Sequence, residues 1–307
     1  MEGQVDRLEA MSIVLLTIEK GSLTAAAKAS NMPLPTVSRK VTELEAYLGT
    51  KLLHRSTRKL TLTDAGQAYV ESVKRIMQDI DEIERTAAGE YTIPRGELVL
   101  TAPVLFGHMY ILPIVTDFLA AYPEIDVRLV LSDRNLHLYD DHVDMAVRIG
   151  TLPDSNMIAT RVGTMDTLVC ASPDLLAALG TPKHPADLEK LPCVVFAGPS
   201  TATWWFRDPA TKRDFDVDIN PRLSVTTAET AVQAALRRTG LTRVYRYHCD
   251  AALRTGALVH VLQAFDVEAI PVSLLHGERR LLPLKMRVFL DFAADRLRSA
   301  MSALGKT

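Results

Sequence analysis

Cysteine is scarce in this chain of 307 residues, and its three positions lie far apart. An odd number of isolated cysteines excludes the disulfide framework of a small secreted domain and offers no metal-binding spacing. The three are Cys170, Cys193 and Cys249. In a reducing compartment we expect them to be buried thiols, with a redox-sensing pair as the alternative.

Long apolar runs, a strong net charge and catalytic motifs are also missing. No apolar run reaches the roughly twenty residues that span a bilayer, and the net charge is only −2. The polar, acidic start MEGQVDRLEAMS is unlike a secretory signal. The sequence has no nucleophile elbow, phosphate-binding glycine loop or metal-ligand cluster. We therefore expect a cytoplasmic protein with no membrane partner, no enzymatic activity and no cofactor.

The size and composition are those of an ordinary protein with more than one domain. The chain is 48% hydrophobic and 23% charged, and it is long enough to bury a substantial core. Its patterning changes twice. The predicted divisions are a small helical module over 1–62, a linker helix over 63–90 and an α/β region over 91–307.

The first division has the pattern of a winged helix-turn-helix, a module that places one helix in the DNA major groove. Gly21 separates two helical segments, residues 31–33 form a turn before Pro35, and Gly49 ends the next helix. Apolar residues three and four apart predict the inner faces of the first and third helices. These residues are Leu8, Met11, Leu15 and Ile18, and then Val37, Val41, Leu44 and Leu48.

Basic residues outnumber acidic ones between Lys28 and Lys59, although the whole chain is slightly acidic. Phosphate contacts dominate protein–DNA affinity, and a local basic patch is sufficient for them. The start of a recognition helix contacts base edges. A few amphipathic helices with scattered cations are the alternative, but three helices, a turn and a basic wing in this order argue against it. The candidate DNA-binding residues are Ser22, Thr24, Pro35, Thr36, Ser38, Arg39, Lys40, Arg55, Ser56 and Arg58.

One long helix is predicted after the module. Thr63 and Asp64 are typical of a helix start, because they satisfy free N–H groups and the helix dipole. Apolar residues then recur at heptad spacing, which favours a dimer-forming helix over a helix packed on its own chain. This seam consists of Tyr69, Val73, Ile76, Ile80, Ile83 and Ala87.

From residue 97 strands and helices alternate, which predicts two α/β lobes with mostly parallel sheets covered by helices. Strands are expected at 98–101, 127–131, 144–150, 167–171, 193–196, 223–225 and 241–244. Helices are expected at 107–121, 228–238 and 284–300. Lobe I is predicted to comprise about 97–165 and 267–300, and lobe II about 166–266.

Three segments near the N-terminus resemble the LysR-type transcriptional regulators: GSLTAAAKAS, MPLPTVSRKVTELEAYLG and LLHRSTRKLTLTDAGQAYV. Further segments, TAPVLFGHMYILP, FLAAYPEIDVRLVLSD and DMAVRIG, resemble the first lobe of their effector domain. The chain departs from the family at Ala29-Ser30, at Leu53 and over 239–247. The resemblance implies a two-lobed effector domain like a periplasmic binding protein, and a homodimer or homotetramer bound to double-stranded DNA.

Ligands of open α/β sheets lie beyond the carboxyl ends of the strands. A helix N-terminus after Thr101 can hold an anion, and Arg148 and Arg243 can each pair with a carboxylate. Thr101 as a helix cap and Arg148 as the partner of a nearby aspartate are the structural alternatives. The candidate effector-binding residues are Thr101, Ala102, Pro103, Arg148, Ile149, Phe196, Thr203, Thr226 and Arg243. They favour a small anionic or polar effector.

Two other functions are compatible with parts of the chain. A two-lobed α/β domain is also typical of the solute-binding proteins of transport systems, and an α/β scaffold can be an enzyme. The N-terminal module argues against the first function and the lack of a catalytic constellation against the second. The sequence therefore predicts a regulator that binds a pseudo-palindromic operator under the control of a small molecule.

Overall fold

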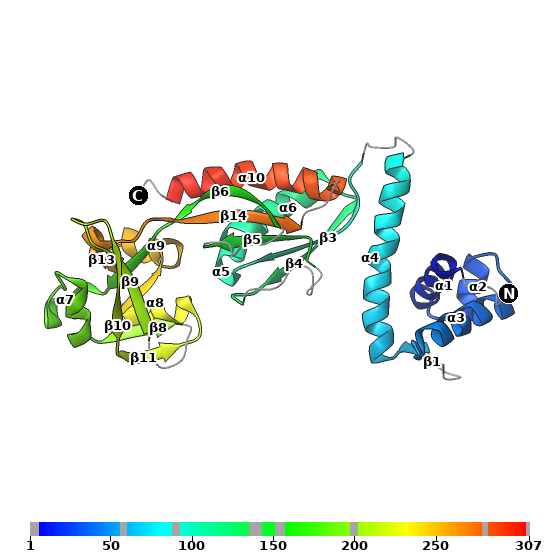
Figure 1. Ribbon diagram of the computed structural model, residues 1–307, viewed down its shortest axis with the longest axis horizontal. Helices are drawn as coiled ribbons and strands as arrows, with labels where there is room; N and C mark the ends of the chain where they lie inside the picture. Colours follow the sequence, from blue (N-terminus) through cyan, green and yellow to red (C-terminus); the bar gives the residue numbers. More distant parts are fainter. Residues whose placement is uncertain are drawn as a thin grey trace. The chain divides into compact units, whose positions relative to one another are not determined.

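The structure is a computed structural model that describes residues 6–55, 60–87, 93–134, 143–150, 157–196, 202–277 and 282–304. The chain divides into two compact units, Met1–Ile93 and Pro94–Thr307 (Figure 1). Each unit has its own hydrophobic core, and each is considered by itself.

The first unit contains three short helices, a two-stranded hairpin and one long helix. These elements are α1 Arg7–Glu19, α2 Leu23–Ala29, α3 Leu34–Leu48, β1 Leu53–Arg55, β2 Leu60–Leu62 and α4 Asp64–Ala87. The two strands are antiparallel, with Leu53 opposite Leu62. The order of helices, turn and hairpin is the one predicted for a winged helix-turn-helix (Figure 1).

Local sequence determines where these helices begin and end. The Ser22 hydroxyl accepts the Ala25 N–H at 3.1 Å and caps α2. Asn31 has a φ of 53° in the turn, and Gly49 has a φ of 67° where α3 ends, as a left-handed helix cap requires. Pro35 lies in the first turn of α3, where its missing N–H leaves no partner unsatisfied. The predicted punctuation is confirmed.

The inner face of α3 is also confirmed, whereas that of α1 is corrected. Val37, Val41 and Leu44 have no exposed surface. On α1, Leu8 of the predicted row is 48% exposed. The buried residues of α1 are Ala10, Ile13, Val14 and Thr17. Because α1 contacts α2, α3 and α4, it is apolar on several sides, and spacing alone does not distinguish its innermost face.

The long helix α4 begins as predicted but packs differently. The Thr63 hydroxyl accepts the Gly66 N–H at 2.8 Å and caps the helix. Val73 is buried within the first unit, so its predicted place in an intermolecular seam is wrong. Ile76, one turn further along, is 43% exposed. The side chains of Ile83 and Ala87 lie outside the part of the chain that the structure describes.

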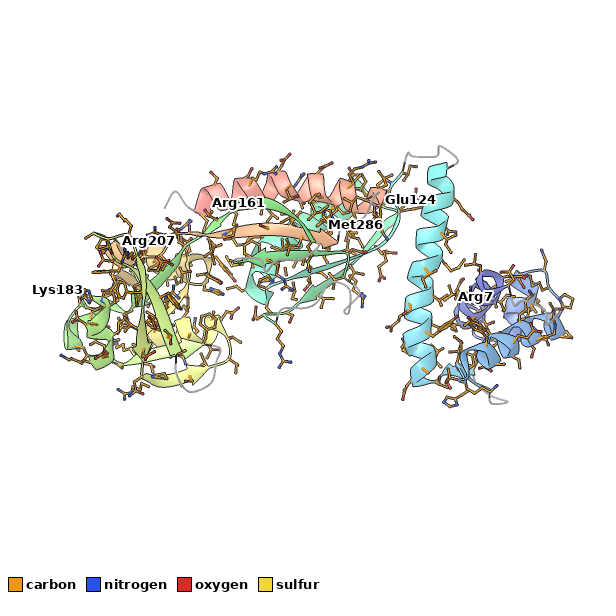
Figure 2. All side chains as sticks on the ribbon, viewed as in Figure 1. Arg7, Glu124, Arg161, Lys183, Arg207 and Met286 are labelled. Carbon is orange, nitrogen blue, oxygen red and sulfur yellow. The ribbon has the colours of Figure 1, made fainter. Side chains whose placement is uncertain are left out.

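The first sheet of the second unit has the strand order β4-β3-β5-β14-β6. Its strands are β3 Gly96–Ala102, β4 Ile125–Leu131, β5 Met145–Ile149, β6 Met157–Met165 and β14 Ile270–Gly277. The helical elements of this part are α5 Val104–Phe106, a π-helix Gly107–Ile111, α6 Leu112–Ala121 and α10 Leu284–Leu304. Met286, in the first turn of α10, is fully buried in the core of this sheet (Figure 2).

The second sheet has the order β11-β8-β12-β7-β13. Its strands are β7 Thr167–Ala171, β8 Cys193–Phe196, β11 Pro221–Val225, β12 Leu241–Tyr245 and β13 Val259–Val261. A separate hairpin pairs β9 Ala202–Arg207 with β10 Asp214–Ile219. The helical elements are α7 Pro173–Leu179, η2 Pro185–Lys190, α8 Ala228–Leu236, α9 Arg246–Arg254 and η3 Gln263–Phe265.

Both sheets are mixed, which corrects the expectation of mostly parallel strands. In the first sheet β14 runs antiparallel to β5 and β6, and in the second β7 runs antiparallel to β12 and β13. These are the strands at which the chain passes between the sheets. The hairpin β9–β10 was not predicted; it buries Trp204 and Phe206 in the second core but leaves Trp205 52% exposed.

The sequence was expected to contain no apolar run long enough to span a membrane. The stretch Val104–Ala121 departs from this expectation. By length and composition alone it resembles a helix that crosses a membrane. Its buried side chains, among them Phe106, Ile111 and Phe118, belong to the core of the first sheet. Packing against that sheet accounts for the apolar composition on this side of the helix.

Candidate functional site

One face of α3 is left uncovered by the rest of the first unit. The exposed residues of this face, called here the outward row, are Pro35, Arg39, Thr42 and Ala46. Their spacing of four, three and four places them on one side of the helix. The opposite side holds the buried valines and Leu44. α3 is therefore anchored by one side and presents the other.

Arg39 is the cation of the outward row. Its guanidinium lies 2.7 Å from the carboxylate of Glu43, one turn along, and its side chain is 62% exposed. An exposed pair of this kind contributes little to stability, so Arg39 can exchange this partner for another acceptor at small cost. Thr36 and Ser38 are half-buried beside the row.

Lys40 is held differently from its neighbour. Its ammonium group pairs with the carboxylate of Glu9 on α1, and its side chain is only 17% exposed. The pair joins α3 to α1 and directs this candidate DNA-binding residue toward the protein.

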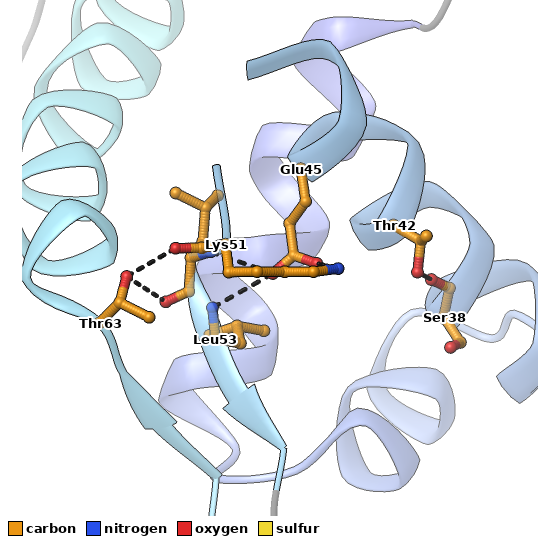
Figure 3. Close-up of polar contacts among 7 residues, drawn as sticks. Ser38, Thr42, Glu45, Lys51, Leu53 and Thr63 are labelled. Atoms are coloured by element: carbon orange, nitrogen blue, oxygen red, sulfur yellow. Dashed lines mark hydrogen bonds and ion pairs between the residues drawn. The ribbon is translucent and has the colours of Figure 1, made fainter. Parts of the chain in front are cut away.

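Thr42 belongs to the same face but was not among the predicted residues. Its side chain is exposed, and its hydroxyl donates to the carbonyl of Ser38 at 2.9 Å (Figure 3). The prediction considered only the first turns of the recognition helix. Extending the spacing from Pro35 and Arg39 by one more step would have found Thr42.

The other predicted DNA-binding residues lie on α2 and the wing. The Ser22 side chain caps α2, and Thr24 is exposed beside it. A hollow of about 550 Å³ adjoins Thr24 at the α2–α3 turn. Arg55 is the last residue of β1, whereas Ser56 and Arg58 lie outside the described residues.

A buried carboxylate holds the start of the wing against α3. Glu45 accepts the backbone N–H groups of Leu52 and Leu53 at 3.0 and 3.2 Å and pairs with Lys51 (Figure 3). Burial alone would raise the pKa of this carboxyl, but Lys51 and the two N–H groups together hold the pKa below its ordinary value. Thr63 donates to the Lys51 carbonyl at 2.7 Å. The recognition helix, wing and α4 are thus joined.

In the first sheet of the second unit, the predicted anion-binding groups already have partners. Thr101 is buried and its hydroxyl donates to the Val130 carbonyl at 2.8 Å, so it joins two strands and does not cap a helix. Pro103 precedes α5, and the next N–H, that of Val104, donates to the Asp133 carboxylate at 3.0 Å. The carboxylate of Asp133 therefore already contacts the helix N-terminus at which an anion was predicted to bind.

Arg148 and Ile149 end β5 beside this region. Arg148 lies opposite Ser273 of β14, and Ile149 lies opposite Val272. Both β5 residues are half-buried, and Ala102 at the end of β3 is buried. Burial lowers the pKa of the Arg148 guanidinium.

In the second sheet the parallel strands β8, β11 and β12 end at one edge. Phe196 is the last residue of β8, and Thr226 follows β11 and is exposed. Arg243 lies within β12, where burial lowers its pKa against the opposing effect of Tyr245 and Asp266. Thr203 lies on the hairpin instead, and its hydroxyl donates to Asp218 at 3.0 Å.

The edge also has an aromatic cluster, of which only Phe196 was among the predicted effector-binding residues. The Tyr245 ring is stacked on His248 at 5.9 Å, and Phe196 lies 6.3 Å from the same imidazole. Tyr247 is buried, with its ring 5.5 Å from Phe106 of α5. Tyr245 ends β12, and Tyr247 and His248 follow it at the start of α9, close to where the sequence departs from the family pattern. Tyr247 connects the second sheet to the core of the first.

A winged helix-turn-helix with an outward recognition face, followed by two α/β sheets joined by crossing strands, defines a ligand-responsive DNA-binding regulator. Residues 8–67 match the bacterial regulatory helix-turn-helix proteins of the lysR family. Residues 93–298 match the LysR substrate binding domain. The chain belongs to the LysR-type transcriptional regulators, which bind DNA, have an effector-binding domain and are not enzymes.

Relatives resemble this chain over almost its whole length. An HTH-type transcriptional regulator of Xanthomonas campestris pv. campestris is 33% identical over 290 residues, which cover 93% of this chain and 84% of the relative. An HTH-type transcriptional repressor of Pseudomonas aeruginosa is 32% identical over 292 residues, 95% of this chain and 92% of the relative.

Solved structures agree with this assignment. CrgA, a LysR-type transcriptional regulator from Neisseria meningitidis, is similar with a TM-score of 0.59 and 30% identity, covering 94% of this chain and 98% of CrgA. Full-length AphB of Vibrio cholerae has the same TM-score and the same coverage at 24% identity, and shares the fold.

Proposed function

We propose that the outward row of α3 contacts base edges in the major groove, with Thr36 and Ser38 beside it. The supporting observation is that this row is exposed while the opposite side of α3 is buried. An arginine can donate two hydrogen bonds to guanine, and hydroxyls can bond to either kind of base. Arg39 is the principal specificity residue in this proposal.

Phosphate contacts are assigned to residues around that helix. A phosphate contact by Thr24 is supported by its exposed position at the start of α2. A phosphate contact by Ser22 is supported by its place at the N-terminus of the same helix. Arg55, Ser56 and Arg58 are assigned from the basic character of the wing, and Lys40 from its place on α3.

Because the target of the protein is chromosomal DNA, we infer that the protein acts in the cytoplasm.

We assign DNA recognition to residues 1–62, dimerisation to 63–90 and effector binding to 91–307. Two exposed apolar surfaces support a homodimer that pairs again into a homotetramer. One is Ile76 on α4. The other consists of the exposed residues Val104, Met109 and Leu112 on the α5–α6 segment. A two-fold dimer requires a pseudo-palindromic operator with half-sites about one helical turn apart.

The assembly is tested by Ile76→Asp, with Gln67→Asp as control because Gln67 is exposed on the same helix. A buried unpaired charge is costly, so Ile76→Asp should lower the mass measured by light scattering, whereas Gln67→Asp should not. An unchanged mass for Ile76→Asp would remove Ile76 from the interface.

We place a small anionic or polar effector at the carboxyl edges of the two sheets. The assigned residues are Thr101, Ala102, Pro103, Arg148, Ile149, Phe196, Thr203, Thr226 and Arg243. Support comes from Phe196 and Thr226 at the ends of parallel strands and from Arg148 and Arg243, whose partial burial would strengthen a bond to a carboxylate. An effector that prefers one conformation would change operator affinity, and DNA would change effector affinity by the same factor.

The regulatory function is tested by capturing fragments of the genome that encodes this chain on the full-length protein. Enriched fragments should share a pseudo-palindrome, and Arg39→Ala should weaken the enrichment and relax the base preference at one position of each half-site. A panel of carboxylates is then added to the binding reaction. Recovery of random fragments by the wild type would contradict sequence-specific binding, whereas enrichment that no carboxylate alters would contradict only the effector class.

A further inference from the structure

Leu34 is an apolar side chain that the fold does not use for its core. It is the first residue of α3 and is 42% exposed. Val37, Val41 and Leu44 are fully buried, and Leu48 packs against the same core. Leu34 lies outside that core cluster as the described residues form it. An apolar group at the leading end of a recognition helix therefore needs another explanation.

The surroundings of Leu34 contain both apolar and polar side chains. Pro33 and Pro35 on either side are exposed, and Met32 is half-buried. The hollow of about 550 Å³ at the α2–α3 turn is bounded by apolar and polar groups together. Its lining residues are Thr24, Ala27, Lys28, Asn31, Met32, Pro33 and Leu34. Lys28 is exposed on α2, so a cation adjoins an apolar surface.

In the major groove of DNA, thymine is the base that presents a methyl group. Guanine presents acceptors at N7 and O6, adenine an acceptor and an amino group, and cytosine an amino group. An apolar side chain gains from contact with the methyl group. Against the other bases it removes water from polar edges without replacing their hydrogen bonds. A leucine at this position therefore favours thymine by contact with its methyl group and disfavours the other bases by removing water from their polar edges.

We propose that Leu34, flanked by Pro33 and Pro35, contacts the 5-methyl group of a thymine in each operator half-site, while Lys28 contacts a nearby phosphate. This proposal rests on the proposed recognition by α3 and adds a base preference to it. The preference comes from the apolar start of the helix and is independent of Arg39.

The test replaces single thymines by deoxyuridine, which lacks only the 5-methyl group, in an operator captured by the wild-type protein. Removal of one buried methyl group from the interface corresponds to roughly fourfold weaker binding. For wild type, we expect this roughly fourfold weakening when deoxyuridine replaces the thymine at one particular position of a half-site, or at the symmetry-related position of the other half-site. For Leu34→Ala the same deoxyuridine substitution should have almost no effect, because the leucine that touches the methyl group is already missing. Leu8→Ala is the matched control, since Leu8 is a similarly exposed leucine on α1.

The outcomes separate this proposal from the proposed function. If wild type binds the operator specifically but tolerates deoxyuridine at every position, the methyl contact is wrong and sequence-specific binding stands. If Leu34→Ala keeps the full deoxyuridine effect, another residue makes the contact. A second variant, Leu34→Gln, should select operators in which adenine replaces the thymine, because an amide can bond to adenine bidentately. Lys28→Ala should weaken all sequences alike.

Discussion

The carboxylate of Glu45 lies 2.8 Å from the ammonium group of Lys51, although the Glu45 side chain is 1% exposed and that of Lys51 is 70% exposed. The lysine extends from the surface over a carboxylate whose other oxygen is held by two backbone N–H groups. A buried charge is tolerated where hydrogen bonds satisfy it. The first residues of the wing are therefore fixed against the recognition helix by one acid.

Glu45→Gln should destabilise the first unit by about 2 to 3 kcal/mol, because charge-assisted hydrogen bonds to buried groups are replaced by weaker ones. Glu43→Gln is the matched control on the same helix, since the Glu43 side chain is 37% exposed and such surface changes usually cost less than about 0.5 kcal/mol. Urea unfolding of the full-length protein measures both. Equal stability of the two variants would contradict the role of Glu45.

The same carboxylate should make stability depend on pH. Its pKa in the folded protein is held below the ordinary value of 4.5, so its contribution is fully present above pH 4.5. That contribution is lost as the pH falls further, through the lowered pKa. The stability difference between wild type and Glu45→Gln should therefore shrink below pH 4.5 and stay constant from about pH 6 to 8. A difference that grows on acidification would contradict this assignment.

Gly66→Ala should destabilise the joint between the wing and α4. A Cβ atom at Gly66 would lie 2.0 Å from the backbone carbonyl oxygen of Leu52, and a backbone atom cannot rotate away as a side chain can. Overpacking of this kind costs about 1 to 3 kcal/mol, occasionally more. Gln67→Ala, at the next and exposed position, is the control. The measurement is thermal unfolding. An unchanged unfolding midpoint for Gly66→Ala would contradict the prediction, because it would mean that α4 can move away from the Leu52 backbone without loss of stability.

The sequence predicted most of the DNA-binding unit because its information is local. Gly21, Gly49, Pro35 and the Thr63 cap each act on their own backbone, and the buried row of α3 follows from its spacing. The row of α1 could not be predicted in the same way. Its sequence MSIVLLTI is apolar on several sides, and contacts with three other helices determine which side is innermost.

The effector domain was harder to predict because its details depend on long-range pairing. β6 reads MIATRVGTM, without a regular alternation of apolar and polar residues, and is a strand because β14, over a hundred residues later, pairs with it. The Thr101 hydroxyl was expected at a helix start, yet the facing strand β4 supplies its acceptor. Asp133 follows β4 but contacts the N-terminus of α5. No local pattern identifies such partners.

The three cysteines should react slowly with thiol reagents in the native protein. All are buried. Burial raises the pKa of Cys193 to about 12, and the hydrogen bond that the Cys170 thiol donates to Cys249, together with burial, raises the pKa of Cys170. The thiolate is the reactive form, so little of it is present at about pH 8. Labelling with a chromogenic disulfide should be slow until urea exposes three thiols. Rapid native labelling would favour the redox-sensing alternative.

Arg39 and Arg58 should have separable effects on DNA binding, because one is assigned to bases and the other to phosphates. Arg39→Ala should weaken operator binding by roughly 1 to 3 kcal/mol and relax specificity at one position of each half-site. Arg58→Ala should weaken operator and random DNA alike, and should lower the slope of log affinity against log salt by about one for each phosphate that the arginine neutralises. Fluorescence anisotropy with both DNAs over a salt series measures the two quantities together.

Because Arg39 and Glu43 form an exposed pair, Glu43→Gln should leave the salt slope almost unchanged. Normal operator binding by the doubly substituted protein would show that neither arginine has its assigned role.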